Sequence, residues 1–136
     1  MRKELDEQLC SECPNLYVDR HASPMETCMV WGFEFFDGWW EIIHDLSVKL
    51  EALIVAMPEE ERKKYKAAQT KEKYGILRVY MSAETDEMTK LINEAENASE
   101  KTCEYCGAAG SLRTKGWLFT LCNKCDQERP WRKPQV

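Results

Sequence analysis

Four cysteines near the C-terminal end stand at the spacing of a metal site. Two Cys-x2-Cys pairs with 15 residues between them supply the four ligands, Cys103, Cys106, Cys122 and Cys125. Two such pairs at this separation are typical of zinc sites in which four thiolates form a tetrahedron. The sequence therefore predicts one Zn2+ ion as the cofactor. Because four thiolates leave no position for water or substrate, we expect this zinc to be structural rather than catalytic.

The segment between the two cysteine pairs predicts a β-hairpin. Residues 111–115 and 117–121 can pair around a turn at Lys115 and Gly116, which would bring the two cysteine pairs together. Gly107, directly after the first pair, suits a turn with positive φ. We therefore expect a zinc-ribbon-like hairpin module that is too short to fold without its metal.

Charge is divided unevenly along the chain. Residues 1–100 hold 12 Lys and Arg against 21 Asp and Glu, a net charge of −9, whereas residues 101–136 hold 7 against 3, a net charge of +4. The two sums give the −5 of the whole chain of 136 residues. We therefore divide the chain into an acidic α+β helical body, residues 1–100, and the basic zinc-ribbon-like module, residues 101–136.

The pattern of apolar residues in the body predicts helices and a short antiparallel sheet, an α+β fold. Apolar residues at steps of three and four predict a core helix over 39–57 and a second amphipathic helix that Thr85 caps. Aromatic and β-branched residues predict strands over 31–36 and 74–81, which we expect to pair. The charged segment 59–73 predicts a short helix exposed to solvent.

A second candidate metal site lies near the N-terminal end. Its ligands would be Cys10, Cys13, His21 and Cys28. The single histidine and the interval of 14 residues between Cys13 and Cys28 make an irregular ligand set, so a cluster of buried or free thiols is the alternative. A redox role for Cys10 and Cys13 is opposed by Glu12, because its negative charge disfavours a thiolate.

Basic and aromatic residues of the module form a candidate nucleic-acid surface. It comprises Arg113, Lys115, Trp117, Lys124, Arg129, Arg132 and Lys133, with Phe119 as a second aromatic ring. Aromatic rings can stack on bases while basic side chains neutralise phosphates. The alternative is that Trp117 and Phe119 pack the hairpin onto the body and that the basic residues only solvate it.

No catalytic constellation stands out in the sequence. It contains no HExxH, GxSxG or phosphate-binding glycine loop, and Glu34, Asp37 and His44 are better explained as capping and surface residues. We therefore expect a binding protein with no small-molecule substrate, not an enzyme. Because no stretch is apolar enough to span a membrane and the charged start lacks a signal peptide, we expect a cytoplasmic location and no membrane partner.

Several segments resemble a group of small, largely uncharacterised proteins encoded by phages and prophages. They are residues 31–46, 71–81, 85–99 and 102–122, including the turn Gly-Phe-Glu-x-x-Asp-Gly-Trp and the strand entry Lys-Glu-Lys-Tyr-Gly. A Cys-Gly of that group is replaced here by Phe35 and Phe36, and its final histidine ligand by Cys125, a change that zinc tolerates. The resemblance implies a phage-type accessory protein acting in the bacterial host cytoplasm; it supplies no substrate.

The most direct functional hypothesis is a non-enzymatic protein that binds and modulates a host macromolecule. The acidic body favours a host protein as partner, including a component of a bacterial defence system that it would inhibit. The alternative is a nucleic-acid-binding protein or transcriptional regulator that acts through the basic, aromatic hairpin.

Overall fold

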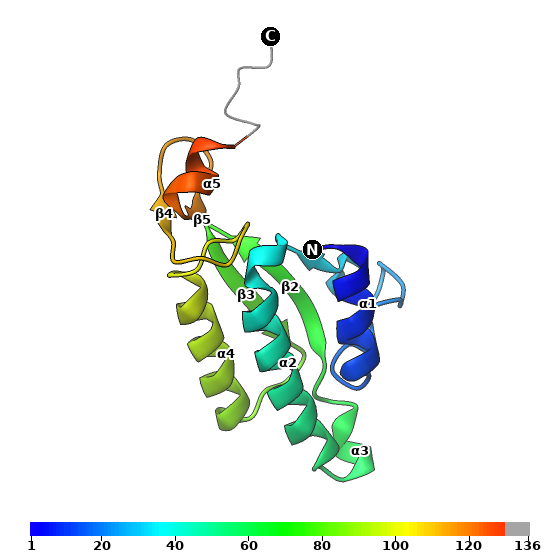
Figure 1. Ribbon diagram of the computed structural model, residues 1–136. Coiled ribbons are helices and arrows are strands. Elements are labelled where there is room, and N and C mark those ends of the chain that lie inside the picture. The colour runs from blue at the N-terminus through cyan, green and yellow to red at the C-terminus, as the bar shows by residue number, and fades with distance from the viewer. Residues whose placement is uncertain (130–136) are drawn as a thin grey trace.

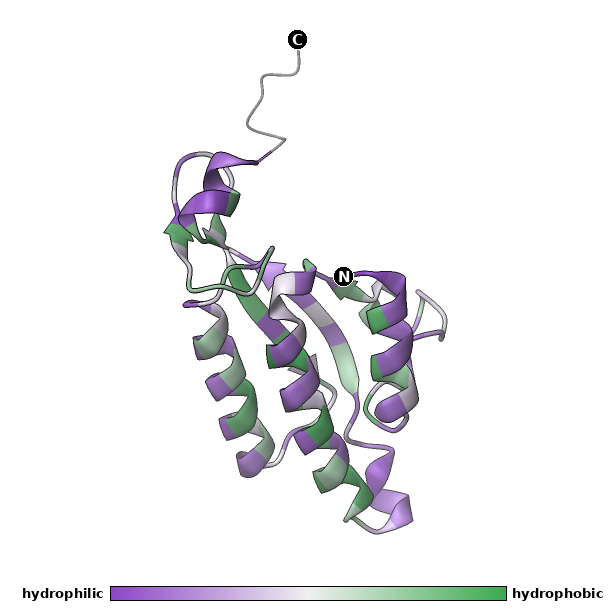
Figure 2. Ribbon diagram, in the orientation of Figure 1, coloured by the Kyte–Doolittle hydropathy of each residue, from purple (hydrophilic) through white to green (hydrophobic). Residues whose placement is uncertain are grey.

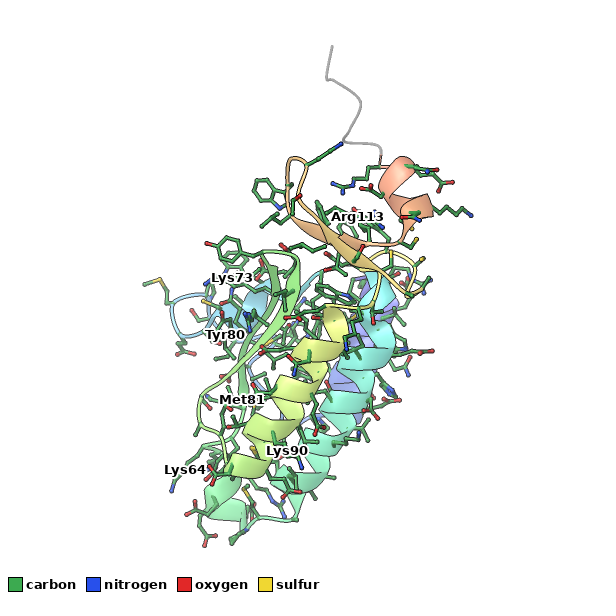
Figure 3. All side chains as sticks on the ribbon, turned by 90° about the vertical axis from the view of Figure 1, so that its left-hand side faces the viewer. Lys64, Lys73, Tyr80, Met81, Lys90 and Arg113 are labelled. Carbon is green, nitrogen blue, oxygen red and sulfur yellow. The ribbon has the colours of Figure 1, made fainter. Side chains whose placement is uncertain are left out.

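The chain folds into a layer of helices on a three-stranded sheet, with a C-terminal hairpin at the end of the sheet. The computed structural model describes residues 1–129. Helices α2 and α4 lie side by side over one face of a three-stranded sheet, α1 lies beside α2, and the hairpin sits at the end of the sheet (Figures 1 and 3). The helices are α1 (Lys3–Glu12), α2 (Trp40–Val55), α3 (Glu59–Arg62), α4 (Asp86–Ser99) and α5 (Asn123–Gln127), with 3-10 turns η1 (Cys28–Trp31) and η2 (Asp37–Trp39). The predicted α+β class is confirmed.

The sheet is mixed rather than antiparallel throughout. Its strands are β1 (Phe33–Glu34), β2 (Ala67–Lys73) and β3 (Ile76–Met81), in the order β1-β2-β3. Strand β2 pairs antiparallel with β3 but parallel with β1, where Phe33 lies opposite Thr70. The prediction that residues 74–81 pair with residues 31–36 is therefore wrong, because β2 lies between them.

Strand β2 is the element that the sequence did not predict. Its residues fall in the segment expected to be a solvated helix, but only Glu59–Arg62 is helical there. Ala67 and Thr70 are the only fully buried residues of β2, so the strand has no apolar alternation that would distinguish it from a surface helix. Its partners β1 and β3, and not its own side chains, determine its conformation.

The first predicted strand is much shorter than expected. Residues 28–31 form the turn η1, and Gly32 ends it with a φ of 75°. Phe33 and Phe35 enter the core, whereas Trp31, which strict alternation along a strand over 31–36 would place on the same side, is 64% exposed. The alternation of buried and exposed side chains that is typical of a strand begins only after Gly32.

Helix α2 confirms the core helix predicted over residues 39–57. Its inward side chains include Ile43, Leu50 and Ile54, all fully buried, and Trp39 is buried just before its first turn. Figure 2 shows apolar and polar residues alternating along α2 and α4, as expected for helices with one face on a core. Thr85 caps α4 as predicted, since its hydroxyl accepts the Met88 N–H at 3.2 Å.

Helix α4 also covers the free edge of the sheet. The Ser99 hydroxyl accepts the Leu77 N–H at 2.9 Å, and the Glu96 carboxylate accepts the Val79 N–H at 3.2 Å. Unpaired strand N–H groups otherwise invite pairing with another chain. These two acceptors therefore satisfy N–H groups of β3 that no further strand reaches.

One buried carboxylate ties the N-terminal segment to the core helix. Glu51 of α2 accepts the Asn15 and Leu16 backbone N–H groups at 2.8 and 3.0 Å, and the Asn15 side-chain amide at 2.9 Å. Hydrogen bonds to a charged group are stronger than neutral ones, and buried donors left without a partner are costly. Glu51 thus fixes the path of the chain between α1 and η1.

We expect Glu51→Ala to lower the free energy of unfolding by about 3 kcal/mol, because three donors lose their acceptor. Urea unfolding followed by circular dichroism measures this change. The control is Asp45→Ala, which removes an exposed carboxylate from the same helix and should change stability by less than about 0.5 kcal/mol. Equal effects of the two substitutions would contradict an anchoring role for Glu51.

Candidate metal centre

The four predicted ligands meet in one cluster. The sulfur atoms of Cys103, Cys106, Cys122 and Cys125 all lie within 4.8 Å of one another, and the Cys106 and Cys122 sulfurs are 3.7 Å apart. A tetrahedron with metal–sulfur bonds of about 2.3 Å requires sulfur separations of about 3.8 Å. The cluster could therefore hold a metal ion.

The first two ligands lie on a tight turn between α4 and the hairpin. The Gly107 N–H donates to the Cys103 carbonyl at 2.9 Å, and the Cys103 N–H donates to the Ala108 carbonyl at 2.7 Å. Gly107 has a φ of 81°, which confirms the expected positive φ after the first pair. This turn carries Cys103 and Cys106, whose sulfurs lie within 4.8 Å of those of the second pair.

The second pair lies at the start of a helix. Strands β4 (Ser111–Arg113) and β5 (Phe119–Leu121) form the predicted antiparallel hairpin, with shorter strands than expected, and α5 follows it. Cys122 is the N-cap of α5, and its sulfur accepts the Cys125 N–H at 3.4 Å. The helix therefore orients both ligands from its first turn.

The electrostatics of the cluster favour a bound cation. The Cys125 N–H holds the pKa of the Cys122 thiol down to about 7. In contrast, burial and the neighbouring sulfurs raise the pKa of the Cys125 thiol. Thiolates crowded together repel one another, and a divalent cation removes that repulsion by binding them in their charged form.

The turn that carries the first pair docks onto the start of the core helix. The Gly38 N–H donates to the Glu104 carbonyl at 2.8 Å, and the Trp39 indole donates to the Thr102 carbonyl at 2.9 Å. A Cβ at Gly38 would lie 2.2 Å from the Cys103 carbonyl oxygen, so only glycine fits. The metal centre therefore contacts the body through its backbone.

A buried acid lies in the same contact. The Glu104 carboxylate accepts the Phe36 N–H at 3.2 Å, and its other oxygen has no hydrogen-bond partner among residues 1–129. Burial raises the pKa of Glu104 to about 7, although the hydrogen bond from Phe36 acts against this rise. The neighbouring Tyr105 ring stacks on Phe36 with centroids 4.2 Å apart.

Two of the arginines predicted to form a nucleic-acid surface have structural roles. Arg113 donates to the Leu121 carbonyl at 2.8 Å and lies 3.9 Å from the Asp126 carboxylate. Arg129 is 4% exposed, pairs with the same carboxylate and lies 5.4 Å from the centroid of the Phe119 ring. The expectation that Arg129 lies on an exposed surface is therefore wrong, because this side chain is buried against Asp126 and Phe119. Arg113 keeps 22% of its side chain exposed and stays a candidate.

The remaining residues of the predicted nucleic-acid surface are exposed where the structure describes them. Lys115, Trp117 and Lys124 are exposed, and Trp117 is 74% exposed. Arg132 and Lys133 lie outside the described residues. The alternative that both aromatic residues pack the hairpin holds for Phe119, which lies 6.3 Å from the Tyr105 ring, but not for Trp117.

The structure does not gather the second candidate metal site. In residues 1–129, the C-terminal cluster is the only set of three or more Cys, His, Asp and Glu ligand atoms close enough to share an ion, and it includes none of Cys10, Cys13, His21 and Cys28. Cys13 is buried in the core and the Cys10 thiol lies 3.6 Å from the Asp6 carboxylate, whereas Cys28 is exposed on η1. Cys10 and Cys13 lie at the end of α1, and the segment that follows keeps His21 and Cys28 apart from them.

The thiols of Cys10 and Cys13 also lack the character of a redox pair. Burial, with the nearby Asp6 carboxylate, raises the pKa of Cys10 to about 11. Burial, together with the charges of Glu51 and Glu12, raises the pKa of Cys13 to about 12. Neither thiol is therefore a ready nucleophile, in line with the effect expected of Glu12.

The three polar residues considered for acid–base chemistry have separate partners. Asp37 pairs with Arg2 at 2.6 Å, His44 pairs with Glu12, and Glu34 accepts from the Gln69 amide at 3.4 Å. His44 also stacks on Trp40, with ring centroids 4.9 Å apart. Each of these three side chains thus interacts with a different partner on the surface.

Comparison of the chain with family models, curated proteins and solved structures gave no match. The assignment of the metal centre accordingly rests on its geometry. Of the helices within residues 1–129, none has the length and apolar character needed to cross a lipid bilayer.

We expect Gly38→Ala to lower the free energy of unfolding by at least about 2 kcal/mol, because the added methyl group overlaps the Cys103 backbone. The control is Gly116→Ala, where no atom lies within 4 Å of the added Cβ and only the positive φ opposes the change. That variant should lose about 1 kcal/mol. Denaturant unfolding of both variants checks the contrast, and an equal loss would argue against a tight contact at Gly38.

Proposed function

We propose that this is a non-enzymatic binding protein whose C-terminal module is folded by one structural zinc ion. The observation behind the zinc is the gathering of four cysteine sulfurs within 4.8 Å, with one pair at 3.7 Å. Soft thiolate ligands favour zinc over magnesium or calcium, and a set of four closes its coordination sphere. Bound there, zinc would supply a cross-link between the turn after α4 and the start of α5.

We expect the purified protein to contain one zinc ion per chain and Cys106→Ser to weaken zinc binding. Substitutions of residues that only hydrogen-bond to metal ligands lower metal affinity by roughly 10- to 100-fold. Because Cys106 is itself a ligand in this proposal, its substitution should lower zinc affinity by more than that. Chelation should make residues 101–129 sensitive to protease while α2 stays protected, because the small module lacks a core of its own. Metal analysis and limited proteolysis with mass spectrometry measure these effects.

The matched control for that substitution is Cys28→Ser, which removes an exposed thiol outside the cluster. Its zinc content and protease pattern should equal those of the unchanged protein. If Cys28→Ser lost zinc as readily as Cys106→Ser, or if chelation abolished a catalytic turnover while the fold survived, a structural zinc in this cluster would be ruled out.

The binding surface that we propose is the groove between α2 and α4. It encloses about 280 Å³. Its apolar residues are Ile42, Leu46, Leu91, Ala95 and Ala98, and its charged residues are Glu41, Asp45, Lys49 and Glu94. The small alanines of α4 leave room between the helices, and apolar grooves between helices commonly receive an amphipathic helix from a partner.

Charge indicates which partner would fit this groove. Lys49 donates to the Asp45 carboxylate at 2.8 Å, so the basic residue is already neutralised by an acid of the rim. Glu41 and Glu94 add further negative charge, and residues 1–100 carry a net charge of −9. A basic amphipathic segment of another protein would complement both the apolar floor and the acidic rim. That the partner is a host protein, including a defence component, rests on the resemblance to phage-encoded proteins alone.

We expect Ala98→Arg and Glu94→Lys each to weaken capture of a protein partner from a bacterial lysate by roughly tenfold or more. The arginine would fill the groove, and the lysine would reverse the charge of its rim. The control is Glu7→Lys, which reverses an exposed charge on α1, outside the groove. Quantitative mass spectrometry of the captured proteins measures the change.

Loss of the partner with all three variants would indicate a nonspecific charge effect rather than a groove. Recovery of nucleic acid without any stoichiometric protein would contradict the proposed function itself.

A further inference from the structure

A second cleft lies where the two hairpins of the protein meet. The turn between β2 and β3 forms one side of the cleft, and the turn between β4 and β5 forms the other. The cleft encloses about 460 Å³. Its lining comprises Glu72, Lys73, Tyr74, Gly116, Trp117 and Leu118, none of which lines the groove between α2 and α4.

The two hairpin turns are fixed relative to each other. The Thr120 hydroxyl donates to the Gly75 carbonyl at 2.7 Å, which is a buried contact between β5 and the first turn. A Cβ at Gly75 would lie 2.7 Å from the Leu112 side chain, so the first turn presses closely on β4. The cleft is therefore held open by packing of the hairpins beneath it.

Tyr74 occupies an unusual position at this turn. With a φ of 55°, it is the only non-glycine residue of positive φ in residues 1–129, and Gly75 follows with 82°. Two positive φ values suit the tight turn of a two-residue hairpin, where asparagine or glycine is the usual first residue. A bulky residue in this conformation is strained, and such strain is concentrated at functional sites. The tyrosine ring is 70% exposed instead of contributing to the core.

The chemistry of the cleft combines exposed aromatic rings with positive charge. Tyr74 and the 74% exposed Trp117 come from the two turns, and the Lys73 ammonium lies 5.8 Å from the Tyr74 ring centroid. Lys115 is exposed beside Gly116 on the second turn. The one acid of the lining, Glu72, accepts the Gly75 N–H at 3.0 Å and so serves the turn itself.

Aromatic rings and positive charge also lie together along the neighbouring face of the sheet. Lys71 and Lys73 project from one face of β2, since side chains two residues apart share a face. The Lys71 ammonium lies 5.9 Å from the centroid of Tyr80, which is opposite Gln69 in the neighbouring strand. Figure 3 shows Lys73 at the end of the sheet that meets the hairpin and Tyr80 further along β3. A ligand longer than the cleft could follow this face.

We propose that this surface binds single-stranded nucleic acid. An unpaired base stacks on the rings of Tyr74 and Trp117, and the adjoining phosphates contact Lys73 and Lys115. Stacking on aromatic side chains combined with backbone neutralisation is the usual means of binding single strands without sequence preference. A cationic ligand between the rings is disfavoured because Lys73 would repel it. Bases within a duplex already stack on each other, so the rings cannot reach their faces.

The test measures binding of a fluorescent oligothymidylate of about ten nucleotides to the zinc-loaded full-length protein. We expect binding that weakens between about 50 and about 200 mM salt. Trp117→Ala and Tyr74→Gly should each reduce affinity by at least about fivefold, the equivalent of one lost base stack. Because glycine accepts positive φ without strain, Tyr74→Gly should melt no lower than the unchanged protein, which separates loss of the ring from loss of the fold.

Matched controls distinguish the cleft from the rest of the surface. Trp31→Ala removes an exposed indole of η1, and Lys90→Ala removes an exposed lysine of α4 (Figure 3). Both should bind as tightly as the unchanged protein, whereas Lys73→Ala should lower the slope of log affinity against log salt by about 0.7, one phosphate contact. Ala98→Arg, which blocks the groove between α2 and α4, should leave oligonucleotide binding intact.

Three results would overturn the proposal. The first is no binding at about 50 mM salt. The second is equal affinity for a duplex, or for an oligoglutamate peptide, which would indicate attraction of charge alone. The third is unchanged affinity in both Trp117→Ala and Tyr74→Gly.

Discussion

The structure depends on a close backbone contact between the start of the core helix and the turn that carries two of the four cysteines. Gly38 donates to the Glu104 carbonyl, and its missing side chain is what allows the approach. Because Gly38 precedes α2 and Glu104 lies between Cys103 and Cys106, this hydrogen bond joins the start of the core helix to the turn that carries the first cysteine pair. The position of the hairpin and of α5 follows from this contact, since among residues 102–129 Leu121 is the only buried apolar side chain besides Cys103.

The sequence predicted features whose signal lies in a few neighbouring residues. The two cysteine pairs, the Thr85 cap and the positive φ of Gly107 are of this kind, and so is the apolar stripe of α2. Strand β2 could not be predicted in this way, because its polar side chains match a solvated helix equally well. It is a strand because β1 and β3 supply its hydrogen-bond partners, and those lie far from it in the chain.

The candidate nucleic-acid surface of the module shows that net charge does not predict which basic side chains are exposed. Net charge counts every arginine as available to a ligand, but Arg129 is buried against Asp126, and Arg113 donates to the Leu121 carbonyl within the module. The spacing of three residues between Asp126 and Arg129 could have indicated their pairing on a helix. No local pattern links Arg113 to Asp126, because the hairpin brings them together. Likewise, nothing in the sequence places Tyr74 beside Trp117, which lie on different hairpins.

The same geometry links the metal to the cleft between the hairpins. Trp117 lies on a hairpin whose strands have three residues each, too few to hold their position without support. Tyr74 belongs to the body, and the Thr120 to Gly75 hydrogen bond joins the two. A metal that fixes both ends of the hairpin would therefore fix the separation of the two rings without touching a ligand. If single strands bind between these rings, we expect zinc to raise their affinity, and by linkage the bound strand then raises the affinity for zinc by the same factor.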